Sequence, residues 1–141
     1  MVLMALLLMV LNWEDKAVYS VASAGDINGD GKEDIIIGAP GDFNVNNYAG
    51  QAYVVYGQAN FTSPLSLSSL NGTNGFIING INPYDFARFS VFSARDINGN
   101  GKDDLIIGAI GVDSDAGAAY VILDPYSSLR THLLMILCEC G

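Results

Sequence analysis

Two stretches of sequence decide the fold: residues 20–41 read SVASAGDINGDGKEDIIIGAPG, and residues 90–111 read SVFSARDINGNGKDDLIIGAIG. Sixteen of these 22 positions are identical, at a constant offset of 70 residues. A second match follows at an offset of 67, where residues 49–56 read AGQAYVVY and residues 116–123 read AGAAYVIL. A tandem repeat of this length indicates a chain built from copies of one structural unit.

Short apolar runs separated by Gly- and Asn-rich turns make up each copy, a pattern typical of β-strands. No helical periodicity of useful length occurs between residues 18 and 123. We therefore predict an all-β fold with about four antiparallel strands in each repeat. In the first copy and the stretch after it, the predicted strands are residues 20–24, 35–38, 51–56 and 76–81.

The repeat boundaries divide the chain into five segments. We predict an apolar N-terminal segment, a first repeat, a linker with a turn, a second repeat and a non-repeat tail, at residues 1–17, 18–57, 58–75, 76–123 and 124–141.

The two ends of the chain differ from the repeats. Residues 1–11 are all apolar, but they are too few to span a membrane, which takes about 20 residues. They have the length of the apolar part of a signal peptide, yet no Lys or Arg precedes them; a signal remnant and an added strand or helix both remain open. In the tail, Cys138 and Cys140 form a C-x-C pair that cannot bridge distant parts of a fold, and His132 has no expected chemical role.

The charge distribution excludes one class of partner and suggests another. The net charge of −9, with only six Lys and Arg residues, argues against nucleic-acid binding. Seven of the 15 acidic residues lie within residues 26–34 and 96–104. Carboxylates packed this densely repel one another unless a cation lies among them.

The first acidic segment has the form D-x-N-x-D-G-x-x-D, which suits calcium because calcium takes six to eight oxygen ligands. The predicted ligands are side-chain oxygens at alternate loop positions, the main-chain carbonyl of the lysine and a closing carboxylate: Asp26, Asn28, Asp30, Lys32 and Asp34. The lysine ammonium is expected to point to water. The segment is not an EF-hand, because position 12 is the apolar Ile37 instead of a glutamate.

The second acidic segment repeats this spacing with one carboxylate fewer. Its predicted ligands are Asp96, Asn98, Asn100, Lys102 and Asp104. Fewer ligand charges mean weaker binding, so we expect two calcium sites with the first tighter. The residues before each final aspartate, Glu33 and Asp103, are expected to face solvent. Asn-Gly and Asp-Gly also favour plain hairpin turns, but two copies with identical spacing favour a metal site.

The chain resembles the FG-GAP repeat family, whose repeats build the β-propeller of integrin α subunits and occur in bacterial surface proteins. The segments that carry the resemblance are residues 20–21, 26–41 and 49–57 in the first copy and residues 89–91, 96–104, 108–109 and 116–123 in the second. The departures from the family pattern include Arg95, where the family has Gly, Ile110, where it has Pro, and the ending at residues 123–124, where an aromatic residue and Gly are expected. The resemblance implies two blades of an incomplete propeller, with calcium bracing the hairpin between the first two strands of each blade.

Three functional interpretations follow. The first is a non-enzymatic, calcium-stabilised module, extracellular or at the cell surface, that acts in adhesion or protein interaction and associates with other blades, with protein ligands or with itself through open blade faces. The second is an accessory part of a larger secreted hydrolase, and the third is a degenerate remnant. The chain itself holds no G-x-S-x-G or H-E-x-x-H motif, so we expect no catalysis.

Overall fold

The structure is a computed structural model, and it describes part of the chain. Backbone and side chains are described for residues 20–39, 49–61, 64–80, 90–109 and 117–123, and the backbone alone for 8–9 and 132–137. Most of the apolar N-terminal segment and both cysteines of the tail lie outside these residues.

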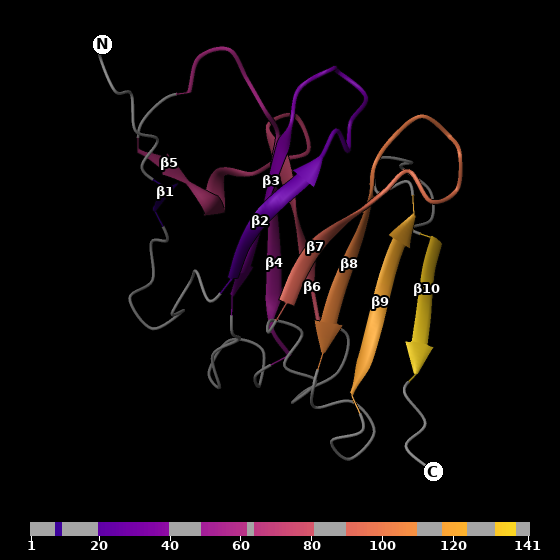
Figure 1. Cartoon of the computed structure of the whole chain (residues 1–141). Coiled ribbons are helices and arrows are strands. Elements are labelled where there is room, and N and C mark those ends of the chain that lie inside the picture. Colours follow the sequence, from indigo (N-terminus) through magenta and orange to yellow (C-terminus); the bar gives the residue numbers. More distant parts are fainter. Residues whose placement is uncertain are drawn as a thin grey trace.

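The first repeat forms a four-stranded antiparallel sheet (Figure 1). Its strands, in spatial order, are β2 (Ser20–Gly25), β3 (Asp34–Ala39), β4 (Gln51–Val55) and β6 (Gly75–Asn79). The isoleucine-rich β3 lies inside the sheet, where apolar residues are buried on both faces. The sequence boundaries assigned β6 to the second repeat, whereas the structure pairs it with β4, so it completes the first sheet. The sheet to which β6 belongs depends on its pairing with β4, and the repeat pattern of the sequence does not show this pairing.

The second repeat forms a matching four-stranded antiparallel sheet. Its strands, in spatial order, are β7 (Ser90–Arg95), β8 (Asp104–Ala109), β9 (Ala118–Leu123) and β10 (His132–Leu137). The fourth strand comes from the tail that the sequence placed outside the repeat. The predicted all-β architecture, with four antiparallel strands per repeat, is confirmed.

A small layer accompanies the first sheet. Strand β1 (Leu8–Met9) pairs in parallel with β5 (Leu65–Ser66), and the one-turn 3₁₀ helix η2 (Leu67–Ser69) follows. Leu67 is fully buried against Ile37 on one face of the first sheet. No helix in the described part of the chain is long and apolar enough to cross a membrane.

The two sheets pack on each other with non-equivalent faces. Ile36 of the first sheet belongs to the same core cluster as Leu105 and Ile107 of the second. In the repeat, Ile36 corresponds to Ile106, which is not among the buried residues of that cluster. The second repeat therefore follows the first head to tail, as consecutive units do in repeat proteins.

This head-to-tail stacking buries one copy of a residue and exposes the other. Ile27, at the second position of the first loop, is 0% exposed, whereas its equivalent Ile97 is 55% exposed. Likewise Ala22 packs against the shared core, while its equivalent Phe92 is 58% exposed. The face of the second sheet that carries Phe92 thus repeats the face that the first sheet uses to pack against its neighbour.

Candidate metal centre

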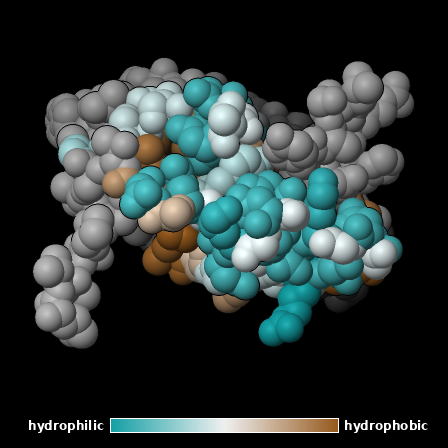
Figure 2. Space-filling model, turned by 90° about the horizontal axis from the view of Figure 1, so that it is seen from above, coloured by the Kyte–Doolittle hydropathy of each residue, from teal (hydrophilic) through white to brown (hydrophobic). Residues whose placement is uncertain are grey.

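Both acidic segments form the loops of hairpins at the same end of the molecule (Figure 1). The first loop, residues 26–33, joins β2 to β3, and the second, residues 96–103, joins β7 to β8. Each loop follows a break in strand register, between Ser23 and Gly25 and between Ser93 and Arg95. Seen from above, this end carries a broad hydrophilic surface (Figure 2).

The carboxylate of Asp26 organises the first loop. Its Oδ1 accepts hydrogen bonds from the backbone N–H groups of Gly29 (2.8 Å) and Asp30 (3.0 Å), and its Oδ2 accepts one from Gly31 (2.9 Å). Asn28 Oδ1 accepts a further bond from the Asp30 N–H at 2.9 Å. These local bonds curl the chain so that side chains from alternate positions lie on the inner side of the loop. Gly31 takes a φ of 83°, which a residue with a Cβ rarely adopts.

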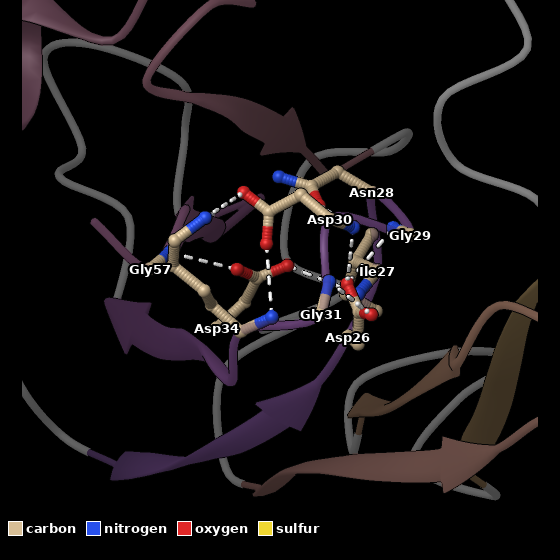
Figure 3. A network of polar contacts seen from close by, with 9 residues as sticks. Asp26, Ile27, Asn28, Gly29, Asp30, Gly31, Asp34 and Gly57 are labelled. Carbon is tan, nitrogen blue, oxygen red and sulfur yellow. Dashed lines mark hydrogen bonds and ion pairs between the residues drawn. The ribbon is translucent and has the colours of Figure 1, made fainter. Parts of the chain in front are cut away.

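Asp34 is the buried residue that connects the loop to the rest of the first sheet. Its side chain is 1% exposed, and its oxygens accept hydrogen bonds from the backbone N–H groups of Ile27 (3.0 Å) and Gly57 (2.8 Å). The carboxylate therefore ties the loop to the end of β4 (Figure 3). Burial raises the pKa of Asp34, and repulsion from Asp26 and Asp30 adds to the rise against the opposing effect of the two backbone bonds.

This raised pKa has a definite effect on stability. A carboxyl group with a raised folded-state pKa favours folding most below its unfolded pKa, and this contribution is lost as the pH rises through the folded value. At neutral pH, the negative charge of Asp34 thus opposes folding. A cation near the three carboxylates would offset that charge.

Asp30 lies at the exposed side of the loop. Its pKa is lowered, chiefly by a hydrogen bond from the Lys32 side chain. Lys32 Nζ lies 3.0 Å from Asp30 Oδ2, and the Lys32 backbone N–H donates to Asp30 Oδ1 at 2.9 Å. The Lys32 ammonium was expected to point to water; it is exposed, and it also pairs with the carboxylate of Asp30, a predicted ligand. Because both groups are exposed, this pair is a weak competitor for a divalent ion.

The second loop repeats most of these contacts. Asp96 accepts hydrogen bonds from the backbone N–H groups of Asn100 (2.9 Å) and Gly101 (2.8 Å). Asp104 is 0% exposed and accepts from the N–H of Ile97 at 3.0 Å, as Asp34 does from Ile27. One difference is that Asn98 donates its side-chain amide to Asp104 Oδ1 at 3.3 Å. The two loops thus have nearly the same internal structure.

The donor set of the first loop fits a hard cation. Figure 3 shows the carboxylates of Asp26 and Asp34 within the loop, where they accept backbone hydrogen bonds, and the carboxylate of Asp30 toward its exposed side, where it accepts hydrogen bonds from Lys32. Their charges act on one another, since Asp26 and Asp30 raise the pKa of Asp34. Carboxylate and amide oxygens are the ligands that calcium prefers, and no sulfur or imidazole is present among the predicted ligands.

The carboxylates alone do not form a complete cluster. Among the described residues, no group of three or more His, Cys, Asp or Glu side chains is placed so that it could hold a metal ion. A cation in the first loop would therefore need Asn28 Oδ1 and the Lys32 carbonyl as well, and the carboxylates would have to move toward it. These two additional oxygens are the ones that the sequence predicts.

Sequence reasoning missed one contact between the repeats. Glu33 is exposed, as expected, but Asp103 is half-buried and hydrogen-bonds to the first loop. Glu33 and Asp103 hold the same position in their loops, so the sequence did not indicate that Asp103 contacts the other repeat. Gly57 was also missed as a partner of Asp34; its place two residues after β4 is a weak signal for that role.

Paired four-stranded sheets, each with an acidic hairpin loop at the same end, define a tandem β-sheet repeat protein of the kind that forms propeller blades. The family model described as FG-GAP repeat matches residues 17–55 and 89–122, which together are more than half of the chain. The chain belongs to the FG-GAP repeat family.

Relatives of two kinds match this chain. It is 36% identical to integrin alpha pat-2 of Caenorhabditis elegans over 91 residues (64% of this chain) and 36% identical to human integrin alpha-11 over 99 residues (68%). It is 32% identical to the phosphatidylinositol-glycan-specific phospholipase D of Rattus norvegicus over 107 residues (72%). The matches span only 7%, 8% and 12% of the lengths of these proteins.

Proposed function

We propose that this chain is a calcium-binding repeat module in which calcium stabilises the hairpin loops. The observation that carries the proposal is the duplication of the loop. In both copies, the first aspartate gathers backbone N–H groups and the last aspartate is buried beneath the loop. Plain turn chemistry does not require a buried carboxylate in either copy, because a turn closes through its own backbone.

The calcium would act structurally. Asp34 connects the loop to Gly57 after β4, so an ion held by Asp34 and Asp26 would fix the first loop against the sheet. Burial raises the pKa of Asp34 and repulsion from Asp26 and Asp30 adds to the rise; calcium would offset this repulsion. No step in this role requires a nucleophile or a general base.

The module would work outside the cell or at its surface, in adhesion or another protein interaction. The similarity of the chain to integrin alpha proteins supports this proposed location and role. Extracellular modules function with calcium dissociation constants of about 0.1–1 mM, so the two- and three-carboxylate loops are sufficient there.

The partners we propose are further repeats of the same kind. Phe92 and Ile97 are more than half exposed, although their equivalents in the first repeat pack in the shared core. A third repeat, presented by a neighbouring segment or a second copy of the chain, would cover this apolar face as the second repeat covers the first. A protein ligand of other structure is the alternative occupant.

A second candidate context is a larger enzyme. The phospholipase D relative matches more of this chain than the integrins do, at 72%. In that context the chain would be an accessory, non-catalytic part. Catalytic sequence in a longer chain would favour this context, and additional FG-GAP repeats would favour the first.

The proposal predicts unequal calcium affinities. In isothermal titration, the first site should bind about tenfold more tightly than the second, because one additional ligand charge at about 4 Å contributes on the order of 1–4 kcal/mol. Asp26→Ala should therefore remove the tighter phase and Asp96→Ala the weaker one. Asn100→Asp serves as the matched control, since it restores the third carboxylate and should tighten the second site. Equal losses in the two alanine variants would contradict the ranking.

A further inference from the structure

The second repeat holds the first residue of the first loop from both sides. The backbone N–H of Asp26 donates to Asp103 Oδ2 at 2.8 Å, and the backbone N–H of Asp103 donates to the Asp26 carbonyl at 3.1 Å. Each residue thus gives one donor and one acceptor to the other. The two residues are 77 positions apart, so the contact joins the two repeats.

The contact between Asp103 and Asp26 is closely packed, and it depends on the absence of a side chain at Gly25. Gly25 has a φ of 77°, and a Cβ at this position would overlap the Asp103 carboxylate. A Cβ on Gly29 would lie 3.4 Å from Cε of Lys102, so the side chain before Asp103 also lies against the first loop. The first loop is accordingly more covered than the second: Asp26 is half-buried, whereas its equivalent Asp96 is exposed.

Asp103 differs from its equivalent in the first repeat, because Asp103 hydrogen-bonds to the other repeat, whereas the equivalent residue hydrogen-bonds within its own. Glu33 holds the same position in the first loop, and its carboxylate accepts a hydrogen bond from Ser23 Oγ of its own repeat at 2.9 Å. Arg95 stands where the first repeat has Gly25, so its Cβ occupies the place that the Asp103 carboxylate takes at the other loop. The second loop could not accept an aspartate in the same way.

We propose that Asp103 is a positioning residue for the calcium site of the first loop, so that this site is complete only when the second repeat is packed against it. This inference rests on the calcium function proposed above. Asp26 is the predicted first ligand, and its carboxylate can face an ion only while its backbone holds the present conformation. Asp103 fixes that backbone through its carboxylate and its backbone N–H.

The expected effect follows from the ordering of one residue. Fixing the backbone of a single residue corresponds to roughly a five- to thirtyfold change in an equilibrium constant. Asp103→Ala removes the carboxylate but keeps the backbone bond, so the calcium affinity of the first loop should fall about fivefold. Because Asp103 adjoins Asp104, a pure charge effect would instead weaken the second loop at least as much.

Backbone amide NMR during a calcium titration separates these effects. The Gly31 N–H donates to Asp26 Oδ2 and the Gly101 N–H donates to Asp96 Oδ2, so each glycine reports its own loop. Asp103→Asn keeps the shape and an acceptor oxygen but loses the charge, whereas Asp103→Glu keeps the charge but adds a methylene where Gly25 leaves no space. Glu33→Gln is the matched control for the loss of one charge beside a loop.

Positioning predicts that Asp103→Ala and Asp103→Glu shift the Gly31 titration to about fivefold higher calcium and leave Gly101 within about twofold. Asp103→Asn and Glu33→Gln should leave the Gly31 titration close to that of the unmodified protein. The inference fails if Asp103→Asn weakens the first loop as much as Asp103→Ala, or if both loops weaken equally. If neither glycine responds to calcium in the unmodified protein, the proposed function fails as well.

Discussion

Replacing Ile27 with alanine should lower the free energy of unfolding by about 2–5 kcal/mol, whereas the same change at Ile97 should alter it by no more than about 0.5 kcal/mol. Ile27 is fully buried in the core between the sheets, and removing three of its side-chain carbons leaves a cavity there. Ile97 is 55% exposed at the equivalent loop position.

This pair is a sharp test because the local sequence is almost the same. Both isoleucines stand in the sequence Asp-Ile-Asn-Gly, so turn propensity contributes equally to the two variants. Urea unfolding followed by far-UV circular dichroism, at one fixed calcium concentration, gives both values. Equal losses at Ile27 and Ile97 would show that the sheets do not stack in the head-to-tail order described above.

Removing the buried carboxylate should have the second large effect. We expect Asp34→Ala to lower the free energy of unfolding in EGTA by about 2–4 kcal/mol, because each unsatisfied buried N–H costs about 1–3 kcal/mol. The buried N–H of Ile27 and the half-buried N–H of Gly57 both lose their acceptor, and water can reach only the second of them. Burial raises the pKa of Asp34, which means that its charged form is unfavourable in the folded protein. The alanine variant removes this charge, so its loss of stability should be smaller than the sum of the costs of the two N–H groups.

Asp30→Ala is the control for this effect. Asp30 belongs to the same predicted ligand set, but it is exposed, and its carboxylate accepts hydrogen bonds from the exposed Lys32 instead of from buried backbone groups. In EGTA this variant should melt close to the unmodified protein. Both variants should lose the calcium response of the first loop. If Asp30→Ala destabilises the calcium-free protein as strongly as Asp34→Ala, Asp34 does not have the anchoring role assigned to it.

Much of the fold could be predicted because the repeat is written in the sequence. Strands β2, β3 and β4 lie within a residue of their predicted bounds, since the isoleucine run and the Gly- and Asn-rich turns mark them locally. The membership of β6 and β10 could not be predicted. Both are outer strands, and their place depends on pairing with β4 and β9, which lies beyond any local pattern.

The candidate site was predictable in its composition but not in its connections. Loop spacing is enough to nominate Asp26 and Asp34, because the alternation of side chains in a curled loop is a local property. The bond from Gly57 to Asp34 and the pair between Asp103 and Asp26 join segments that are 23 and 77 residues apart. The substitution of Arg95 for the glycine of the first repeat was one sequence signal that the two loop entrances differ.

The most direct test of the account is thermal melting with and without calcium. A ligand that binds the folded state with a dissociation constant of 0.1 mM stabilises it by about 2.7 kcal/mol when present at a hundredfold excess, that is, at about 10 mM. With two sites of the proposed strength, the melting temperature should rise on the order of 10 °C between EGTA and 10 mM calcium. An identical melting temperature in both conditions would contradict the central claim that calcium holds these loops in place.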